Sequence, residues 1–265
     1  MSVTGLPMDD NAPAPSRRHA TGLSGIAPYN IYFEVAPGEA CAAHVAELPG
    51  CHVLAVDESD ALARLPEAIE RHRAWREKHG LPRAGEPGAP LIVRQSVFGA
   101  RPWRITGASA LFTIDRRLLT DLEVDAHLRL LACARADLLR AAHTIPRGAF
   151  DDVIPGDSRT PREVLIHTAD TEEWLVSRLG RRVTVLEPDP LRRLVDVRAG
   201  TLEHLMRYDR ADRDLIFVPT ERTSEDPDEM WSLRKFLRRL IEHELDHLED
   251  LQIAASHWSH GTGLD

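Results

Sequence analysis

A pair of histidines one helical turn apart, His243 and His247, is the feature of this 265-residue sequence with the clearest chemical potential. Residues at i and i+4 of an α-helix project from the same face, so both imidazoles can reach one ion. The pair lies in line with the apolar residues Phe236, Leu240 and Leu251, which predicts that it points into a helix bundle. Two imidazoles buried side by side need a partner, and a divalent metal satisfies both. The alternative is a pair of solvated histidines on a charged helix.

A third protein ligand is available in His167, which lies in an apolar helical segment over residues 164–175. A single histidine on an apolar face is more often a core residue than a ligand, but opposite the pair across a bundle it completes a three-histidine site. Three neutral imidazoles with open coordination positions suit Zn²⁺, with Ni²⁺ or Fe²⁺ as alternatives, and water or substrate would complete the shell. We expect five other histidines to be background: His44, His52, His204, His257 and His260.

The string His-Glu-Leu-Asp-His over residues 243–247 also matches the zinc-protease signature, in which Glu244 would be the general base. The extended forms of that signature require Gly and His downstream, where this chain has Asp250 and Ile253. No glutamate beyond Glu249 is available as a more distant ligand. The sequence therefore disfavours a protease.

Four amphipathic segments in the second part of the chain predict a four-helix bundle. Leucines recur at helical spacing in the first and third segments, and prolines and glycines separate the segments. The predicted helices cover about 115–143, 161–179, 190–208 and 230–256.

The first part of the chain predicts a small α/β unit after a tail over residues 1–28, which lacks hydrophobic periodicity. Three short strands are followed by a predicted helix, which is capped by Asp57 or Ser59 and extends to about His79. Three prolines and three glycines within residues 80–90 indicate a linker or long loop. The predicted strands cover 31–35, 40–45, 52–56 and 91–98. The expected class is thus α+β, with an α/β domain over 29–100 and a bundle over 112–256.

The segment Leu165–Trp174, together with the late His-x-x-x-His pair, resembles the DinB-like family of metal-binding four-helix bundles. The resemblance implies that His167, His243 and His247 are the metal ligands. Members of that family include S-transferases and isomerases that use mycothiol, bacillithiol or glutathione. Asp170 and Trp174 match the motif that follows the first histidine, and Asp170 and Glu244 are candidates to support the ligands from the second coordination shell.

The segment from Ala43 to Cys51, which contains Leu-Pro-Gly-Cys, and the segment from Asp57 to Ile69 resemble a HicB-like antitoxin domain over residues 29–80. That resemblance implies a small RNase-H-like fold that acts by binding protein. No ribbon-helix-helix or helix-turn-helix segment follows. We therefore expect regulation or dimerisation of the bundle rather than neutralisation of a toxin.

The overall composition excludes some classes of function. With 33 Lys and Arg against 42 Asp and Glu, the chain carries a net charge of -9 and is not expected to bind nucleic acid. Three cysteines without a paired pattern, and no apolar run of membrane-spanning length, predict a cytoplasmic protein without membrane association.

The leading hypothesis is a metal-dependent S-transferase, isomerase or hydrolase that acts on a small molecule, with a low-molecular-weight thiol such as mycothiol as possible cofactor. The alternative is a non-catalytic, metal-stabilised binding or regulatory protein that acts through its HicB-like domain. For either function we consider a homodimer or a HicB-like protein partner.

Overall fold

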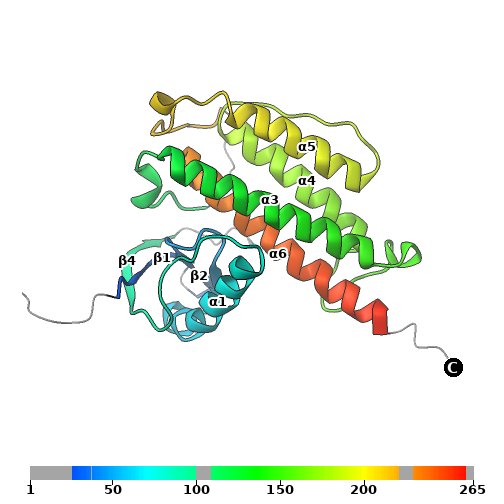
Figure 1. Cartoon of the computed structure of the whole chain (residues 1–265), viewed down its shortest axis with the longest axis horizontal. Coiled ribbons are helices and arrows are strands. Elements are labelled where there is room, and N and C mark those ends of the chain that lie inside the picture. The colour runs from blue at the N-terminus through cyan, green and yellow to red at the C-terminus, as the bar shows by residue number, and fades with distance from the viewer. Residues whose placement is uncertain (1–25, 37, 100–108, 221–228, 261–265) are drawn as a thin grey trace, which may run out of the picture.

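In the described residues, a four-stranded sheet and five α-helices give the chain an α+β fold (Figure 1). This computed structural model describes residues 26–36, 38–99, 109–220 and 229–260. Most of the predicted tail over residues 1–28 lies outside the described residues. The α+β class predicted from the sequence is confirmed.

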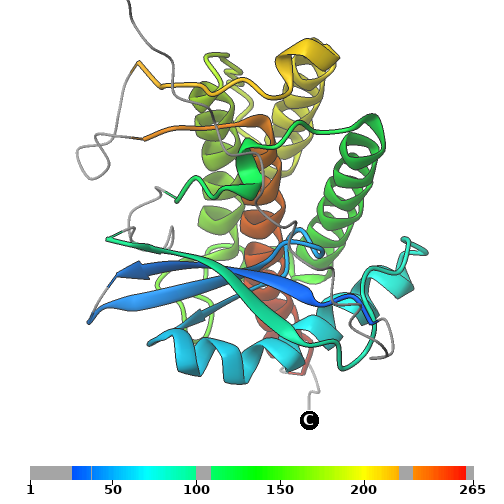
Figure 2. The same cartoon turned by 90° about the vertical axis from the view of Figure 1, so that its left-hand side faces the viewer.

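The sheet has the strand order β3-β2-β1-β4. Strands β1 (Tyr29–Ala36), β2 (Ala40–Val45) and β3 (His52–Ala55) pair antiparallel, and β4 (Leu91–Phe98) pairs parallel to β1. Helix α1 (Glu58–Lys78) is capped at its N-terminus by Asp57, whose side chain accepts a hydrogen bond from the backbone N–H of Asp60. Alternate residues of β1 pack under α1, and the sheet forms a layer between α1 and the other helices (Figure 2).

The bundle consists of α3 (Asp121–Thr144), α4 (Pro161–Arg178), α5 (Pro190–Leu205) and α6 (Leu233–His260). Both α3 and α4 pack against α6, and α5 packs against α4. Short 3-10 turns over 114–116, 147–149 and 210–212 lie in the connections between these elements. Helix α6 therefore lies between α3 and α4, and α5 joins the bundle mainly through α4.

Two helix starts differ from the predictions for a local reason. Residues 114–116 form a separate 3-10 turn, and α3 begins only after Thr120, whose side chain forms a capping box with Glu123. Helix α6 begins after Ser232, whose hydroxyl accepts a hydrogen bond from the Lys235 backbone, because Trp231 forms a β-bridge with Phe217 instead. Helix α5 ends at Leu205, before the predicted 208.

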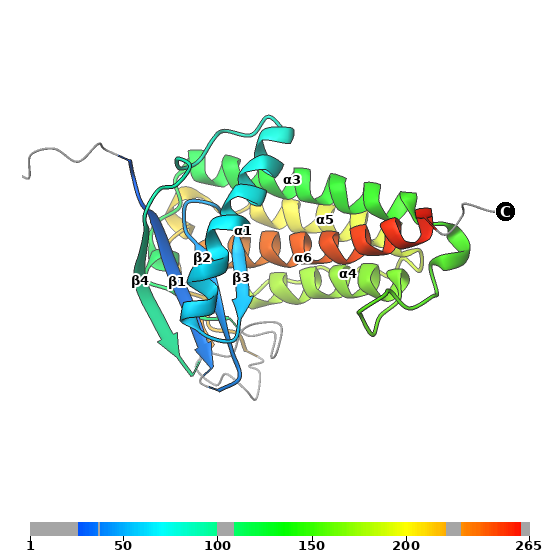
Figure 3. The same cartoon turned by 90° about the horizontal axis from the view of Figure 1, so that it is seen from below.

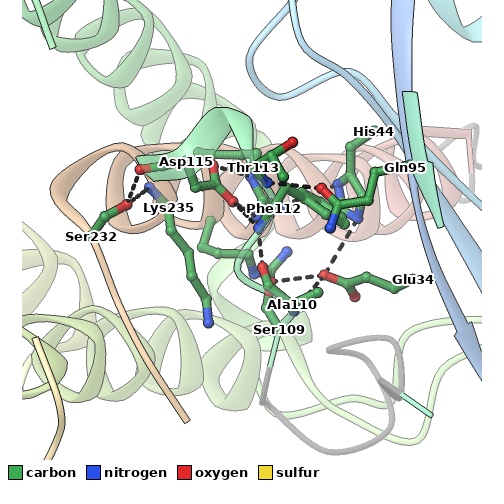
Figure 4. Close-up of polar contacts among 12 residues, drawn as sticks. Glu34, His44, Gln95, Ser109, Ala110, Phe112, Thr113, Asp115, Ser232 and Lys235 are labelled. Carbon is green, nitrogen blue, oxygen red and sulfur yellow. Dashed lines mark hydrogen bonds and ion pairs between the residues drawn. The ribbon is translucent and has the colours of Figure 1, made fainter. Parts of the chain in front are cut away.

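The sheet and the bundle meet along α6 (Figure 3). Gly50, in the turn before β3, has a positive φ of 94°, and a Cβ there would lie 2.6 Å from a methyl of Ile241. Polar contacts continue this seam: Ser109 and the Ala110 backbone donate to Glu34 of β1, and Ser232 donates to the Asp115 carbonyl (Figure 4). The α/β unit therefore contacts the helix that carries the histidine pair.

Candidate metal centre

The three histidines singled out in the sequence converge between α4 and α6. The Nε2 atoms of His243 and His167 are 3.2 Å apart, and those of His247 and His243 are 3.1 Å apart. Ligand atoms from all three lie within 4.8 Å of one another. His243 and His247 are buried, whereas His167 is exposed. The trio therefore has one side open to solvent.

The spacing of these nitrogens fits a shared metal ion. Bonds of about 2.0–2.1 Å at tetrahedral angles place ligand nitrogens roughly 3.3 Å apart, close to the two Nε2 separations. The three rings also lie at steep angles to one another, between 58° and 85°. Imidazole nitrogens arranged in this way can direct their lone pairs to one point. Among the described residues, this is the group of three or more His, Cys, Asp or Glu side chains whose ligand atoms lie close enough together to share one metal ion.

The protonation of the rings favours ligation. The side chain of His167 is exposed overall, but partial desolvation of its imidazole, together with the neighbouring His247, lowers its pKa to about 4. Burial, together with both neighbouring imidazoles, lowers the pKa of His243 well below its usual value. Both rings are therefore neutral at neutral pH, and neutral imidazole is the form that binds metals.

An aspartate that was not predicted to belong to the site holds one of the three histidines. Asp250 Oδ2 lies 2.8 Å from Nδ1 of His247. A carboxylate accepts hydrogen bonds, so this contact places the proton on Nδ1 and leaves the Nε2 lone pair directed at the other histidines. Arg159 in turn donates to Asp250 at 3.3 Å and pairs with Asp157. The spacing of Asp250, one turn after His247, was the only signal available in the sequence.

Glu244 lies on a different face of α6 and does not reach the histidines. Its two carboxylate oxygens bind Arg135 of α3 and Arg198 of α5, the latter at 2.7 Å. The same two arginines bind Glu172 of α4, each at 2.7 Å. All four side chains are buried. The structure thus places Glu244 in a salt-bridge network of the bundle core, and not where a protease base or a support for the histidines would lie.

Among the described residues, Asp170 makes no hydrogen bond to the histidines, and its charge acts on His167 only by opposing the lowering of that histidine's pKa. Its carboxylate lies 2.6 Å from Arg193 of α5 and is half exposed. Trp174, the other residue of the resembling motif, packs edge-on against Trp231 with ring centroids 5.8 Å apart. Asp170 is therefore held by the neighbouring helix, and Trp174 is part of the bundle packing.

Two of the background histidines link the sheet to α6. His44 Nδ1 lies 2.7 Å from Glu242, and His52 Nε2 lies 3.1 Å from Asp246. Burial by itself would lower the pKa of His52, but Asp246 outweighs it and raises that pKa to about 9. These pairs lie at the seam between the two parts of the chain, and no periodic pattern in the sequence predicted them.

Comparison of the chain with family models, curated proteins and solved structures gives no significant match. The resemblances to DinB-like and HicB-like proteins therefore stay predictions.

None of the helices in the described ranges combines the length and the apolar character needed to cross a membrane. The functional argument consequently depends on the geometry of the site.

Proposed function

We propose that the protein is a metal-dependent enzyme whose divalent ion, Zn²⁺ in the first instance, is held by His167, His243 and His247. The observation that supports this proposal is the convergence of three imidazole nitrogens from two helices, with Nε2 separations of 3.1 and 3.2 Å. A metal held there would supply Lewis-acid chemistry, lowering the pKa of a coordinated thiol or water so that a nucleophile exists at neutral pH.

The chain's own residues have distinct roles in this proposal. Asp250 fixes the tautomer and orientation of His247 through Nδ1. The exposed side of His167 leaves a path for a small substrate. The resemblance to DinB-like proteins favours a low-molecular-weight thiol such as mycothiol as the nucleophile, and the reaction classes are S-transfer, isomerisation or hydrolysis.

The first experiment measures metal content after purification without chelators. We expect about one equivalent of metal in the wild type and loss of most of it in His167→Ala, with the helical circular dichroism unchanged. His143→Ala, an exposed histidine on α3, serves as the control and should retain the metal. Full metal occupancy in His167→Ala would overturn the ligand assignment.

The second experiment measures conjugation of thiols to electrophilic small molecules, and hydrolysis of ester or amide substrates, with and without His243→Ala. We expect activity that is lost with the metal. A metal-loaded wild type that is inactive across both assays, and that co-purifies with a small protein through its α/β unit, would instead support the binding or regulatory alternative.

A further inference from the structure

A cavity of about 260 Å³ lies at the seam between the α/β unit and the bundle. It is bounded by the turn after β2, the C-terminal part of α1, the 3-10 turn over 114–116, α3 and the first turns of α6. Figure 3 shows the end of α1 beside α3, which agrees with this position. On α6 the cavity is lined by Arg234, Arg238 and Glu242, and the metal ligands are not among its lining residues. The cavity is therefore separate from the proposed metal centre.

Most charges that line the cavity are already neutralised. Arg234 pairs with Glu123 at 2.8 Å, and Arg238 pairs with Asp115 at 2.9 Å. Arg238 also lies 3.6 Å from Glu242. These five groups account for two of the three lining cations and three of the four lining anions.

Arg76 is the lining cation without an acidic partner among the described residues. Its side chain is on α1, is only 8% exposed, and donates from Nε and Nη2 to the carbonyl of Pro82 at 3.3 and 2.9 Å. Its Nη1 group makes no hydrogen bond within the described part of the chain. Burial lowers the pKa of Arg76, with no carboxylate to offset the effect. A buried guanidinium without a carboxylate is costly, and an anionic group entering the cavity would relieve that cost.

Glu47 is the lining anion without a cationic partner among the described residues. Its two carboxylate oxygens accept hydrogen bonds from the backbone and side-chain amides of Asn30, the former at 2.9 Å. Each carboxylate oxygen can accept two hydrogen bonds, so capacity for a further donor remains. One cation and one anion, both lacking ionic partners in the described structure, thus line the same cavity.

Apart from His127, whose Nδ1 lies 2.6 Å from the Glu123 carbonyl, the remaining surface of the cavity is apolar. It is formed by Val45, Ala46, Pro49, Ile114, Ala126 and Leu130. The volume of about 260 Å³ is below the roughly 300–1,000 Å³ of pockets for drug-sized ligands. A ligand that fits must therefore be small, with an apolar body and charged groups of both signs.

We propose that this seam cavity binds a small zwitterion with an apolar body, of the α-amino acid class, whose carboxylate pairs with Arg76 and whose ammonium pairs with Glu47. Such a ligand contacts α1 and the β2–β3 turn on one side and α3 and α6 on the other. It therefore stabilises the docking of the α/β unit on the bundle. This inference does not depend on the metal or on the proposed enzymatic activity.

The test is isothermal titration calorimetry of the full chain with leucine and phenylalanine, each compared with its deaminated acid and its decarboxylated amine. We expect one of the amino acids to bind and to raise the melting temperature. Each singly charged analogue should bind at least about tenfold more weakly, because one charged hydrogen bond is lost.

Three variants and one control locate the site. Arg76→Met and Glu47→Gln should each weaken binding by at least about tenfold. Ala126→Phe places a ring in the cavity from the exposed surface of α3, leaves both charges in place, and should abolish binding in a folded protein. Arg71→Met, an exposed residue on α1 that pairs with Glu67, should bind as the wild type does.

Two results would overturn the proposal. One is the absence of binding of both amino acids to the wild type at up to about 10 mM. The other is binding that persists in the folded Ala126→Phe variant, or that is as tight for the singly charged analogues as for the amino acids.

Discussion

Replacing Arg198 by methionine tests the salt-bridge network that ties together the helices carrying the three clustered histidines. Arg198 binds Glu172 of α4 and Glu244 of α6, and Arg135 binds the same two carboxylates. Glu172 is five residues from His167, and Glu244 is adjacent to His243. The network therefore links α4 and α6, the two helices that carry the histidine trio, close to the histidines themselves.

The expected loss of stability follows from burial. The side chains of Arg198, Glu172 and Glu244 are at most 9% exposed. Removing one partner from a buried ion pair leaves an uncompensated charge and costs about 3–5 kcal/mol. For a protein of this size that loss lowers the melting temperature by about 6–20 °C.

The effect should depend on pH in a defined direction. Burial would raise the pKa of Glu172, but Arg198 and Arg135 outweigh it and lower that pKa from 4.5 to about 2. The wild type therefore has this stabilisation above about pH 4.5 and loses it as the pH falls toward 2. In Arg198→Met, Glu172 takes up a proton at a higher pH, so the difference in stability between variant and wild type should shrink on acidification.

The assay is urea unfolding followed by circular dichroism at neutral pH and at about pH 3.5. Arg207→Met is the matched control, because Arg207 pairs with Glu203 at the surface and should change stability by no more than about 0.5 kcal/mol. A loss in Arg198→Met below about 1 kcal/mol at neutral pH, or an equal loss at both pH values, would refute the reasoning.

Three further outcomes are expected. Asp250→Asn removes the carboxylate that orients one ligating imidazole and should weaken metal binding about 10- to 100-fold in a chelator competition, whereas Asp170→Asn should leave the affinity unchanged. Zinc at 100 times its dissociation constant should stabilise the wild type by about 2.7 kcal/mol in thermal unfolding, and a similar shift in His243→Ala would contradict the proposed centre. Gly50→Ala should destabilise the protein by more than about 1 kcal/mol in urea unfolding, because its Cβ would clash with α6. Gly38→Ala, also at positive φ but with open space around it, should cost less stability. Equal losses in the two variants would show that backbone strain alone is responsible.

The sequence was sufficient to predict the elements whose signals are local. The i, i+4 spacing of His243 and His247 predicted that both lie on one face of one helix, and both rings meet on one side of α6. Such signals depend on neighbours within about one helical turn, which the sequence displays directly. The predicted start of the first bundle helix at 115 was wrong because hydrophobic periodicity continued through a turn that the Thr120 cap interrupts.

The roles of individual polar residues depended on the packing of elements far apart in the chain. Glu244 follows His243 directly, yet a rotation of about 100° per residue around the helix axis directs it to Arg135 and Arg198 in the core. Asp170, three residues after His167, is held by Arg193 of α5. Neither outcome could be predicted without knowing which helix lies on which side.

The sequence by itself determined that this chain has an α+β fold and carries a histidine pair that can share one ion. The sequence also predicted His167 as a third ligand, but only the tertiary structure showed that its Nε2 lies 3.2 Å from that of His243. Only the tertiary structure, too, showed that Asp250 lies against His247 and that the seam has a cavity lined by two charges without ionic partners in the described structure. The physical reason is that helix periodicity is set by local hydrogen bonds, whereas the meeting of distant side chains is set by how whole helices and the sheet pack.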